Sequence, residues 1–350
     1  MNGKSEIRMA MVGCGEISHT HAEAATNVEG VRFVSCCDVA ETKAREWMEK
    51  YGCDSWYGSF ETLLAGEQID AVVLSTWPIQ HLEQIELSLK HGVKNILCEK
   101  SLTLSGQDAA KVWHLVQENG AFLMEACKYR HHPAIKKIES ILASGEVGRI
   151  DNISATFSNF EPEETATGTD RNWRYRRECG GGVTHDWMSY LVNGANHFSG
   201  SAPKRVFATG TVSAQYDIIT RLYGMIEYEN GITANISSSK DASFSQALEI
   251  SCSKGILSLP VSWGIFGNVT LTRRHRMQEW PYILTDSYEI EHKDSFALQL
   301  RNFAEVIRGE AQPVLPLSQS VINVHTIEAL AASVFEKRIV EIQLPDMSVS

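Results

Sequence analysis

The chain has 350 residues, 43% hydrophobic and 21% charged, which excludes a disordered or fibrous protein and favours two domains over one small module. Lysine and arginine number 32 against 43 aspartates and glutamates, and the formal net charge of −11 disfavours nucleic acid as a partner. Eight cysteines without the spacing of a zinc site indicate buried thiols in a reducing compartment, with no metal and no disulfide framework.

The first 128 residues alternate short apolar strands with amphipathic helices. They open with MNGKSEIRMAMVG, which has no apolar run long enough for a signal peptide, and no stretch of the chain approaches the ~18 apolar residues of a membrane span. We therefore expect a cytoplasmic protein without a membrane partner. Strands are predicted at residues 8–12, 32–38, 71–76, 95–99 and 121–126, with helices at 19–27, 41–51, 81–91 and 105–119. This βαβ order predicts an α/β domain over residues 1–128, with the doubly wound parallel sheet of a Rossmann fold.

Residues 129–350 follow a different pattern, which predicts an α+β domain. One helix at 133–144, closed by Gly145, precedes β-rich runs separated by tight turns such as Glu229-Asn230-Gly231 and Lys254-Gly255. Late helices at 295–308 and 318–336 are expected to cover one side of this mainly antiparallel sheet. The polar segment 161–170 is predicted to be a mobile loop.

A glycine-rich turn lies where the first strand meets the first helix. Residues Gly13-Cys14-Gly15-Glu16-Ile17-Ser18 fit the pattern G-x-G-x-x-S. In this pattern Gly13 permits the tight turn and Gly15 lets the backbone approach a pyrophosphate, whose charge the helix N-terminus stabilises. Ser18 replaces the usual third glycine or alanine with another small residue.

The end of the second strand supports a dinucleotide site. Asp38 lies about 20 residues beyond the glycine turn, where an acid that binds the ribose hydroxyls belongs. Val39 and Ala40 supply no cation for a 2′-phosphate, so the sequence predicts NAD rather than NADP. The alternative is a glycine-rich turn beside a solvated aspartate, without a cofactor.

Several segments together resemble the glucose-fructose oxidoreductase, inositol dehydrogenase and rhizopine-catabolism (Gfo/Idh/MocA) family over nearly the whole chain. Their order and spacing carry the resemblance. They are the Gly13–Ser18 turn followed by His21, Ser75–His81 (STWPIQH), Ile96–Ser101 (ILCEKS), Lys128–Pro133 (KYRHHP) leading to SGEVGRI, and Asn172–Tyr190. The resemblance implies a two-domain, often oligomeric enzyme that moves hydride between nicotinamide and a hydroxyl carbon of a sugar, inositol or similar polyol.

The resemblance also implies proton-transfer residues. The lysine of the family's Glu-Lys-Pro motif matches Lys100, with Ser101 where the family usually has proline. The aspartate of its G-G-G-x-x-x-D-x-x-x-H pattern matches Asp186, and Tyr190 takes the place of the terminal histidine, as in the glucose-fructose oxidoreductase branch. His185 is a rival proton carrier, because an unperturbed imidazole titrates near neutrality.

Residues expected to bind the cofactor lie at the carboxyl ends of the strands, where open α/β sheets place their ligands. They are Gly13, Gly15, Glu16, Ile17, Asp38, Ser75, Thr76, Trp77, His81, Glu99 and Lys100. Trp77 either borders the nicotinamide or packs a loop. For His21 and His81 a structural role is favoured over a catalytic one.

A helix is predicted around residues 186–198. Four polar residues recur on one of its faces, namely Asp186, Tyr190, Asn193 and His197, and apolar residues that should pack recur on another, namely Trp187, Leu191, Ala195 and Phe198. This arrangement would turn His185 about 100° away from Asp186. The basic residues Arg171, Arg174, Arg176 and Arg177 either clamp a substrate anion or, as we favour, pair with Glu178 and the acidic loop.

We therefore expect an NAD-dependent oxidoreductase of CH–OH groups, in which Lys100 and Tyr190 handle the hydroxyl proton and Asp186 orients them. By resemblance, residues 129–350 would bind the substrate and form a homo-dimer or homo-tetramer through the second sheet. Two alternatives remain open: a sensor that binds NAD or sugar without turnover, and an NAD-using glycoside hydrolase.

Overall fold

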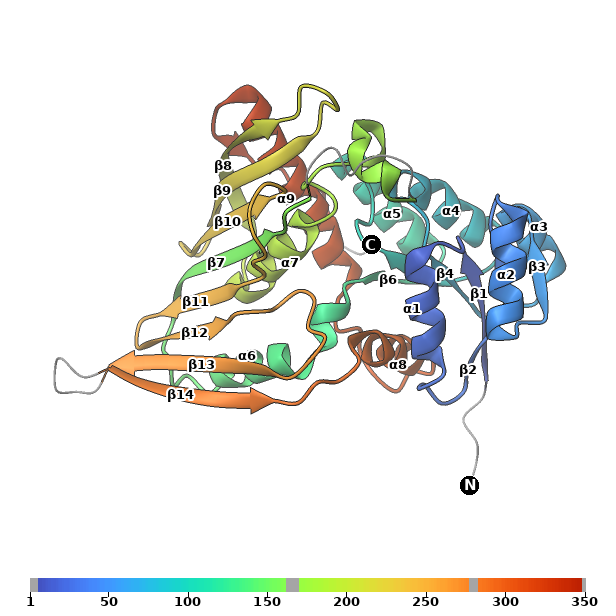
Figure 1. The fold of residues 1–350 in the computed structure, drawn as a ribbon, viewed down its shortest axis with the longest axis horizontal. Helices are drawn as coiled ribbons and strands as arrows, with labels where there is room; N and C mark the ends of the chain where they lie inside the picture. Colours follow the sequence, from blue (N-terminus) through green and yellow to red (C-terminus); the bar gives the residue numbers. More distant parts are fainter. Residues whose placement is uncertain (1–5, 162–169, 277–282, 348–350) are drawn as a thin grey trace. The chain divides into compact units, whose positions relative to one another are not determined.

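The structure is a computed structural model that describes residues 6–161, 170–276 and 283–347, and for residues 170–172 it describes the backbone only. The chain divides into two compact units (Figure 1). The first comprises Met1–Lys128, Phe296–Val321 and Asp346–Ser350, and the second comprises Tyr129–Ser295 and Ile322–Pro345. Residues 162–169 of the segment predicted as a mobile loop lie outside the described residues.

The first unit contains a parallel sheet of six strands in the order β3-β2-β1-β4-β5-β6. The strands are β1 (Ile7–Val12), β2 (Val31–Cys37), β3 (Ser55–Tyr57), β4 (Ala71–Leu74), β5 (Asn95–Glu99) and β6 (Phe122–Ala126). The predicted Rossmann sheet is confirmed, and β3 is the strand that the sequence pattern did not reveal. Successive strands are added on one side of β1 up to β3 and on its other side from β4 onward, so the strand order reverses between β1 and β4. Doubly wound sheets bind ligands at the carboxyl ends of the strands at such a position.

Five helices connect the strands of this sheet, and some of them begin or end at recognisable capping residues. They are α1 (Glu16–Ala25), α2 (Glu41–Tyr51), α3 (Phe60–Gly66), α4 (Pro78–Lys90) and α5 (Gly106–Glu118). Ser59 and Ser105 each accept the amide hydrogen of the third residue beyond them, which caps α3 and α5. Gly52 adopts a left-handed conformation with φ of 68° and ends α2.

Helix α8 (Ser295–Ile307) was expected on the second sheet, and this expectation is wrong. Phe296, Leu300 and Phe303 belong to the core of the first unit. The ring of Phe303 stacks on that of Phe122 in β6, with centroids 5.4 Å apart. An apolar helix face predicts that the helix will be buried on that side, but it does not predict which sheet the helix packs against.

The second unit contains a nine-stranded sheet in the order β14-β13-β12-β11-β7-β10-β9-β8-β15. The strands are β7 (Ile150–Ser158), β8 (Pro203–Val212), β9 (Ile219–Tyr228), β10 (Thr233–Ser239), β11 (Leu248–Cys252), β12 (Gly255–Leu259), β13 (Val269–Arg276), β14 (Ile283–Ile290) and β15 (Val340–Glu341). The pairs are antiparallel except β7 with β10, which is parallel, so the mainly antiparallel prediction is confirmed. The predicted turn between β9 and β10 contains Gly231 with φ of 84°.

Three further helices are α6 (Pro133–Ala143), α7 (Met188–Ser199) and α9 (Leu317–Glu336) (Figure 1). The second half of α9 packs on the second sheet, where the Ser333 hydroxyl accepts the amide hydrogen of Ala208 in β8 at 2.8 Å. Gly224 of β9 lies close against this helix, since an added Cβ would lie 2.8 Å from a methyl group of Leu330.

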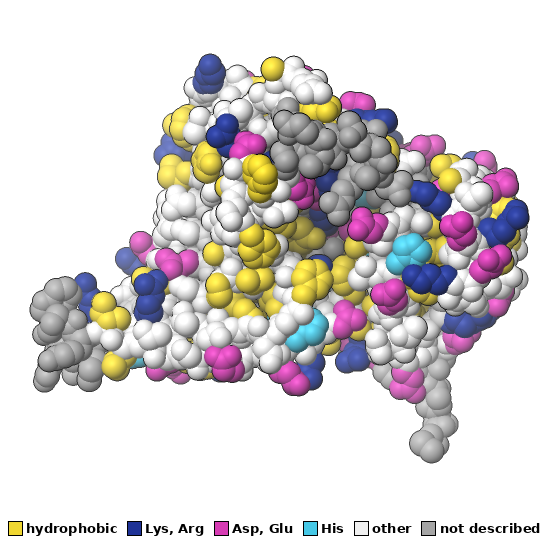
Figure 2. All heavy atoms as spheres, viewed as in Figure 1, with side chains coloured by type: hydrophobic (Ala, Val, Ile, Leu, Met, Phe, Trp, Pro, Cys, Tyr) yellow, Lys and Arg dark blue, Asp and Glu magenta, His cyan; other side chains and the backbone are white. Residues whose placement is uncertain are grey.

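The surface and the interior agree with the composition. Lysine and arginine side chains alternate with aspartate and glutamate over the face drawn in Figure 2. All eight cysteines carry free thiols and seven of them are buried. Among the described residues, none of the helices has the length and apolar character needed to cross a membrane.

Candidate active site

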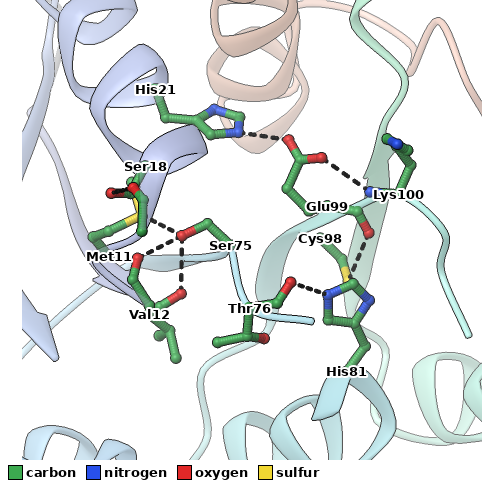
Figure 3. Close-up of polar contacts among 12 residues, drawn as sticks. Met11, Val12, Ser18, His21, Ser75, Thr76, His81, Cys98, Glu99 and Lys100 are labelled. Carbon is green, nitrogen blue, oxygen red and sulfur yellow. Dashed lines mark hydrogen bonds and ion pairs between the residues drawn. The ribbon is translucent and has the colours of Figure 1, made fainter. Parts of the chain in front are cut away.

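The turn from β1 to α1 has the geometry of a phosphate-binding loop. Gly13 has φ of 87°, and a Cβ there would lie 2.9 Å from the Thr76 side chain and 3.2 Å from the Ser75 carbonyl group, so only glycine fits. At Gly15 an added Cβ would meet nothing within 4 Å, which leaves open space beside the N-terminus of α1. Glu16 and Ile17 form the first turn of α1, and Ser18 donates from its hydroxyl to the Gly15 carbonyl at 2.6 Å (Figure 3).

The carboxylate of Asp38 is held beside this turn. Its Oδ2 accepts the amide hydrogen of Cys14 and its Oδ1 accepts that of Ala40, each at 2.8 Å. A carboxylate offers about four acceptor positions, so both oxygens keep capacity for hydroxyl groups of a ligand. The open glycine turn and the oriented carboxylate therefore fit the pyrophosphate and ribose of a dinucleotide.

The residues after β4 fasten the glycine turn and the next loop. The Ser75 hydroxyl donates to the Gly13 carbonyl at 2.6 Å (Figure 3). His81 of α4 is fully buried, with Nε2 3.2 Å from the Thr76 carbonyl and Nδ1 3.0 Å from the Ser101 carbonyl. Burial lowers the pKa of His81, and the carbonyl groups act in the opposite direction. The ring of His81 therefore joins two loops, in line with the structural role favoured for it, while Trp77 lies partly exposed just before α4.

Lys100, the predicted proton-transfer residue, follows a buried histidine–glutamate hydrogen bond at the end of β5. His21 of α1 places Nε2 2.8 Å from Oε1 of Glu99, and Glu99 Oε2 accepts the amide hydrogen of Lys100 at 3.2 Å (Figure 3). Burial raises the pKa of Glu99, but the hydrogen bond and charge of His21 and the charge of Lys100 bring it below the ordinary value. Lys100 itself remains partly exposed at the carboxyl edge of the sheet.

In the second unit, Asp186 lies in a turn and not on a helix, so the predicted helix face is wrong at its start. Helix α7 begins at Met188. Gly180 and Gly182 have φ of 85° and 87°, and a Cβ on Gly181 would lie 2.7 Å from the carbonyl oxygens of Arg174 and Arg176. The close approach of these backbones holds the chain in turns, and the 100° helical angle between His185 and Asp186 no longer applies.

Asp186 is buried and paired with an arginine. Arg174 Nε donates to Asp186 Oδ2 at 2.6 Å, and the Arg174 guanidinium lies over the buried Trp173 ring at 4.9 Å. Arg177 pairs with Asp217. The favoured pairing of the arginines with Glu178 and the acidic loop stays a prediction, because residues 162–169 of that loop lie outside the described residues. The side chain of Arg171 lies outside the part of the chain that the structure describes.

Most polar residues of α7 support the fold. Asn193 Oδ1 accepts from the Tyr129 hydroxyl at 2.6 Å. The Nδ1 atom of His197 lies 2.8 Å from Arg130 Nη2, and its Nε2 atom lies 2.8 Å from Glu139 Oε1. Tyr190 differs, because it is partly exposed and meets the rings of Tyr129 and Phe157 at 6.0 and 5.9 Å. The apolar face of the helix is buried as predicted.

His185 is a poorer proton carrier than the sequence indicated. Its Nδ1 is buried and has no hydrogen-bond partner within the described ranges. Burial lowers the pKa of His185 to about 4, so the ring is neutral at pH 7. Among the described residues, no group of three histidine, cysteine, aspartate or glutamate side chains is arranged to hold a metal ion.

Sequence reasoning missed Glu125, which contacts the loop after Lys100. This carboxylate is buried at the end of β6, and its Oε1 accepts the amide hydrogen of Leu102 at 2.9 Å. The signal was a charged residue within the otherwise apolar run AFLMEA.

Two segments of the chain match family models. Residues 7–127 match "Oxidoreductase family, NAD-binding Rossmann fold", and residues 135–258 match "GFO/IDH/MocA C-terminal domain". Among curated proteins, D-xylose 1-dehydrogenase (NADP(+)) 2 of Haloferax volcanii is 29% identical over 293 residues, covering 84% of this chain and 86% of that protein.

Solved structures share the fold. A 3-ketoreductase from Actinomadura kijaniata, in complex with NADP and TDP-benzene, has a TM-score of 0.83 at 21% identity over 94% of this chain and 98% of that one. The WlbA dehydrogenase from Bordetella pertussis, in complex with NADH and UDP-GlcNAcA, has a TM-score of 0.82 at 19% identity over 97% of this chain and 100% of that one.

Proposed function

The chain belongs to the Gfo/Idh/MocA oxidoreductase family, and from this premise we propose that it is an NAD-dependent dehydrogenase acting on a hydroxyl carbon of a sugar or polyol. The observation that carries the proposal is the pair formed by the open glycine turn and the oriented carboxylate of Asp38. One related protein is named a D-xylose dehydrogenase, and a solved structure of the same fold carries the nucleotide sugar UDP-GlcNAcA, which supports a substrate of the sugar class.

The preference for NAD rests on charge. Asp38 is held at the turn by two backbone amides, and a fixed carboxylate repels a 2′-phosphate while it accepts from ribose hydroxyls. The solved structures do not decide between the two cofactors, since one carries NADP and another carries NADH. The electrostatics of this chain's own residues therefore decide our choice.

The proposed mechanism gives separate roles to the cofactor and to three side chains. When bound, the nicotinamide supplies the hydride acceptor or donor. Lys100 and Tyr190 exchange the proton of the reacting hydroxyl with the surroundings, as general acid–base groups. Asp186, which is paired with Arg174, is proposed to orient Lys100 and Tyr190.

The proposed cellular setting follows from the thiols. Eight unpaired cysteines favour a reducing compartment, and we propose the cytoplasm.

The proposed function is tested by NADH absorbance with a panel of inositols, aldoses, amino sugars and uronic acids, comparing the natural protein with Lys100→Met. We expect turnover with at least one member, and a loss of at least about 100-fold in Lys100→Met with nearly unchanged NAD affinity. Binding of NAD and sugar without turnover would favour a sensor. Release of an aglycone without net NADH formation would favour a glycoside hydrolase.

A further inference from the structure

The loop after β5, residues Lys100–Leu102, is a buried loop whose backbone is held by side chains. Ser101 and Leu102 are 1% and 0% exposed. Buried backbone groups need hydrogen-bond partners, and in this loop three titratable side chains supply them. Glu99 accepts from the Lys100 amide (Figure 3), His81 lies against the Ser101 carbonyl, and Glu125 accepts from the Leu102 amide.

Glu125 stands out because it places a carboxyl group in an otherwise apolar stretch of β6. Its neighbours in β6 are apolar and buried, and its partner across the sheet is Cys98 of β5. A buried carboxyl group is costly unless it is hydrogen-bonded, so an apolar residue would suit the strand better. The hydrogen bond from the Leu102 amide, two residues beyond Lys100, offsets part of this cost.

The surroundings of Glu125 let it titrate near neutral pH. The pKa of Glu125 is raised to about 7, because burial and the charge of Glu99 raise it by more than the Ser320 hydroxyl, the Leu102 amide and the charge of Lys100 lower it. The charged or titratable groups that face it are Glu99, Lys100 and Cys98, and the group contributed by α9 is the uncharged Ser320.

We propose that Glu125 is a positioning residue for Lys100: by accepting the Leu102 amide hydrogen, its side chain holds the Lys100–Leu102 loop in the conformation from which Lys100 reaches the substrate. The inference rests on the proposed role of Lys100 in proton transfer. A small displacement of such a group lowers the rate of the chemical step more than it lowers ligand binding.

Two variants separate positioning from charge. Glu125→Gln keeps an oxygen that accepts the Leu102 amide, and Glu125→Met removes the acceptor at similar length. At pH 6 we expect Glu125→Gln to keep kcat within about threefold, and Glu125→Met to lose about tenfold or more in kcat, with KM and NAD affinity nearly unchanged. Glu118→Gln, an exposed charge removal at the end of α5, is the matched control and should behave as the natural protein.

The pH profile gives a second readout. In the natural protein kcat should rise through a limb near pH 7, because a carboxylate accepts a hydrogen bond more strongly than a carboxylic acid. The limb should be absent in Glu125→Gln, because a glutamine side chain does not titrate in this range, and present in Glu118→Gln.

A third readout does not depend on activity. The pKa of Glu125 is raised in the folded state, so between its ordinary value near 4.5 and about 7 the folded protein binds more protons than the unfolded chain. Its contribution to stability is complete at low pH and is lost as the pH rises through this window. The Tm of Glu125→Gln relative to the natural protein should therefore rise from pH 5 to pH 8, and that of Glu118→Gln should not.

The outcomes distinguish the inference from the function on which it rests. Loss of kcat in Glu125→Met with rescue in Glu125→Gln supports positioning. If Lys100→Met is inactive but Glu125→Met keeps its kcat, or if both Glu125 variants lose NAD affinity and kcat equally, the positioning role is overturned and the function stands. If Lys100→Met keeps its turnover, the proposed role of Lys100 fails and the inference fails with it.

Discussion

Asp38 illustrates how one oriented carboxylate can select a ligand. Both of its oxygens accept backbone amide hydrogens, so the negative charge cannot turn away from a 2′-phosphate. We predict that NAD binds more tightly than NADP by more than about tenfold, or ~1.4 kcal/mol. Asp38→Asn removes the charge and keeps one acceptor oxygen, and it should narrow this gap mainly by strengthening NADP binding.

Calorimetric titration of each cofactor without substrate measures the gap directly. Glu41→Gln, a charge removal in the first turn of the following helix, serves as the control for net charge. Equal dissociation constants for NAD and NADP in the natural protein would rule out the assignment.

Tyr190 and His185 compete for the proton-transfer role, and their environments differ. The ring of His185 is neutral at pH 7 because burial lowers its pKa to about 4, while Tyr190 is partly exposed in the first turn of α7. We predict that Tyr190→Phe lowers kcat by at least about 100-fold, with the remaining rate rising toward alkaline pH as the substrate hydroxyl ionises unaided.

The matched variant is His185→Gln, which should change kcat by less than about threefold, and steady-state rates from pH 5 to pH 10 compare the two. An active Tyr190→Phe together with an inactive His185→Gln would transfer the role to His185.

At the scale of elements, α8 shows that a helix can belong to a sheet far away in the sequence. Phe303 is fully buried and stacks on Phe122 of β6. Replacing a buried phenylalanine with alanine costs roughly 3–5 kcal/mol, so Phe303→Ala should destabilise the first unit. Hydrogen exchange should increase in peptides from β1 and β6 and stay unchanged in β8 to β10.

Phe335→Ala is the control, because its side chain is 43% exposed near the end of α9 and its removal should cost little. Increased exchange confined to the second sheet in Phe303→Ala would contradict the placement of α8.

At the scale of the whole molecule, one face of the second sheet carries exposed apolar side chains. Phe207 of β8 is paired in register with Met225 of β9, and with Tyr223 these residues are 44%, 44% and 47% exposed. Such a face indicates association. We predict a homo-oligomer through this face, which Tyr223→Lys combined with Met225→Lys should convert to a monomer in sedimentation velocity.

Phe266→Lys is the matched control, since Phe266 is 80% exposed outside the strands. A sedimentation coefficient that is the same for the double variant and the natural protein would contradict the prediction of an oligomer through this face.

The sequence by itself determined the features that depend on neighbouring residues. Alternating strand and helix periods predicted the Rossmann sheet, glycine at positions 13 and 15 predicted the phosphate-binding turn, and Asp38 marked the ribose side of it. These features follow from backbone conformation and from side chains a few positions apart, so they are visible without a three-dimensional structure.

Only the tertiary structure decided the features that depend on long-range packing. It assigned α8 to the first sheet, put Asp186 in a turn against Arg174, and brought Glu125 to the amide of Leu102. Each of these contacts joins segments whose separation in the chain leaves no periodic signal. Burial then changed the chemistry, since desolvation raised the pKa of Glu125 and lowered that of His185, and the degree of burial is set by the whole fold and not by the local sequence.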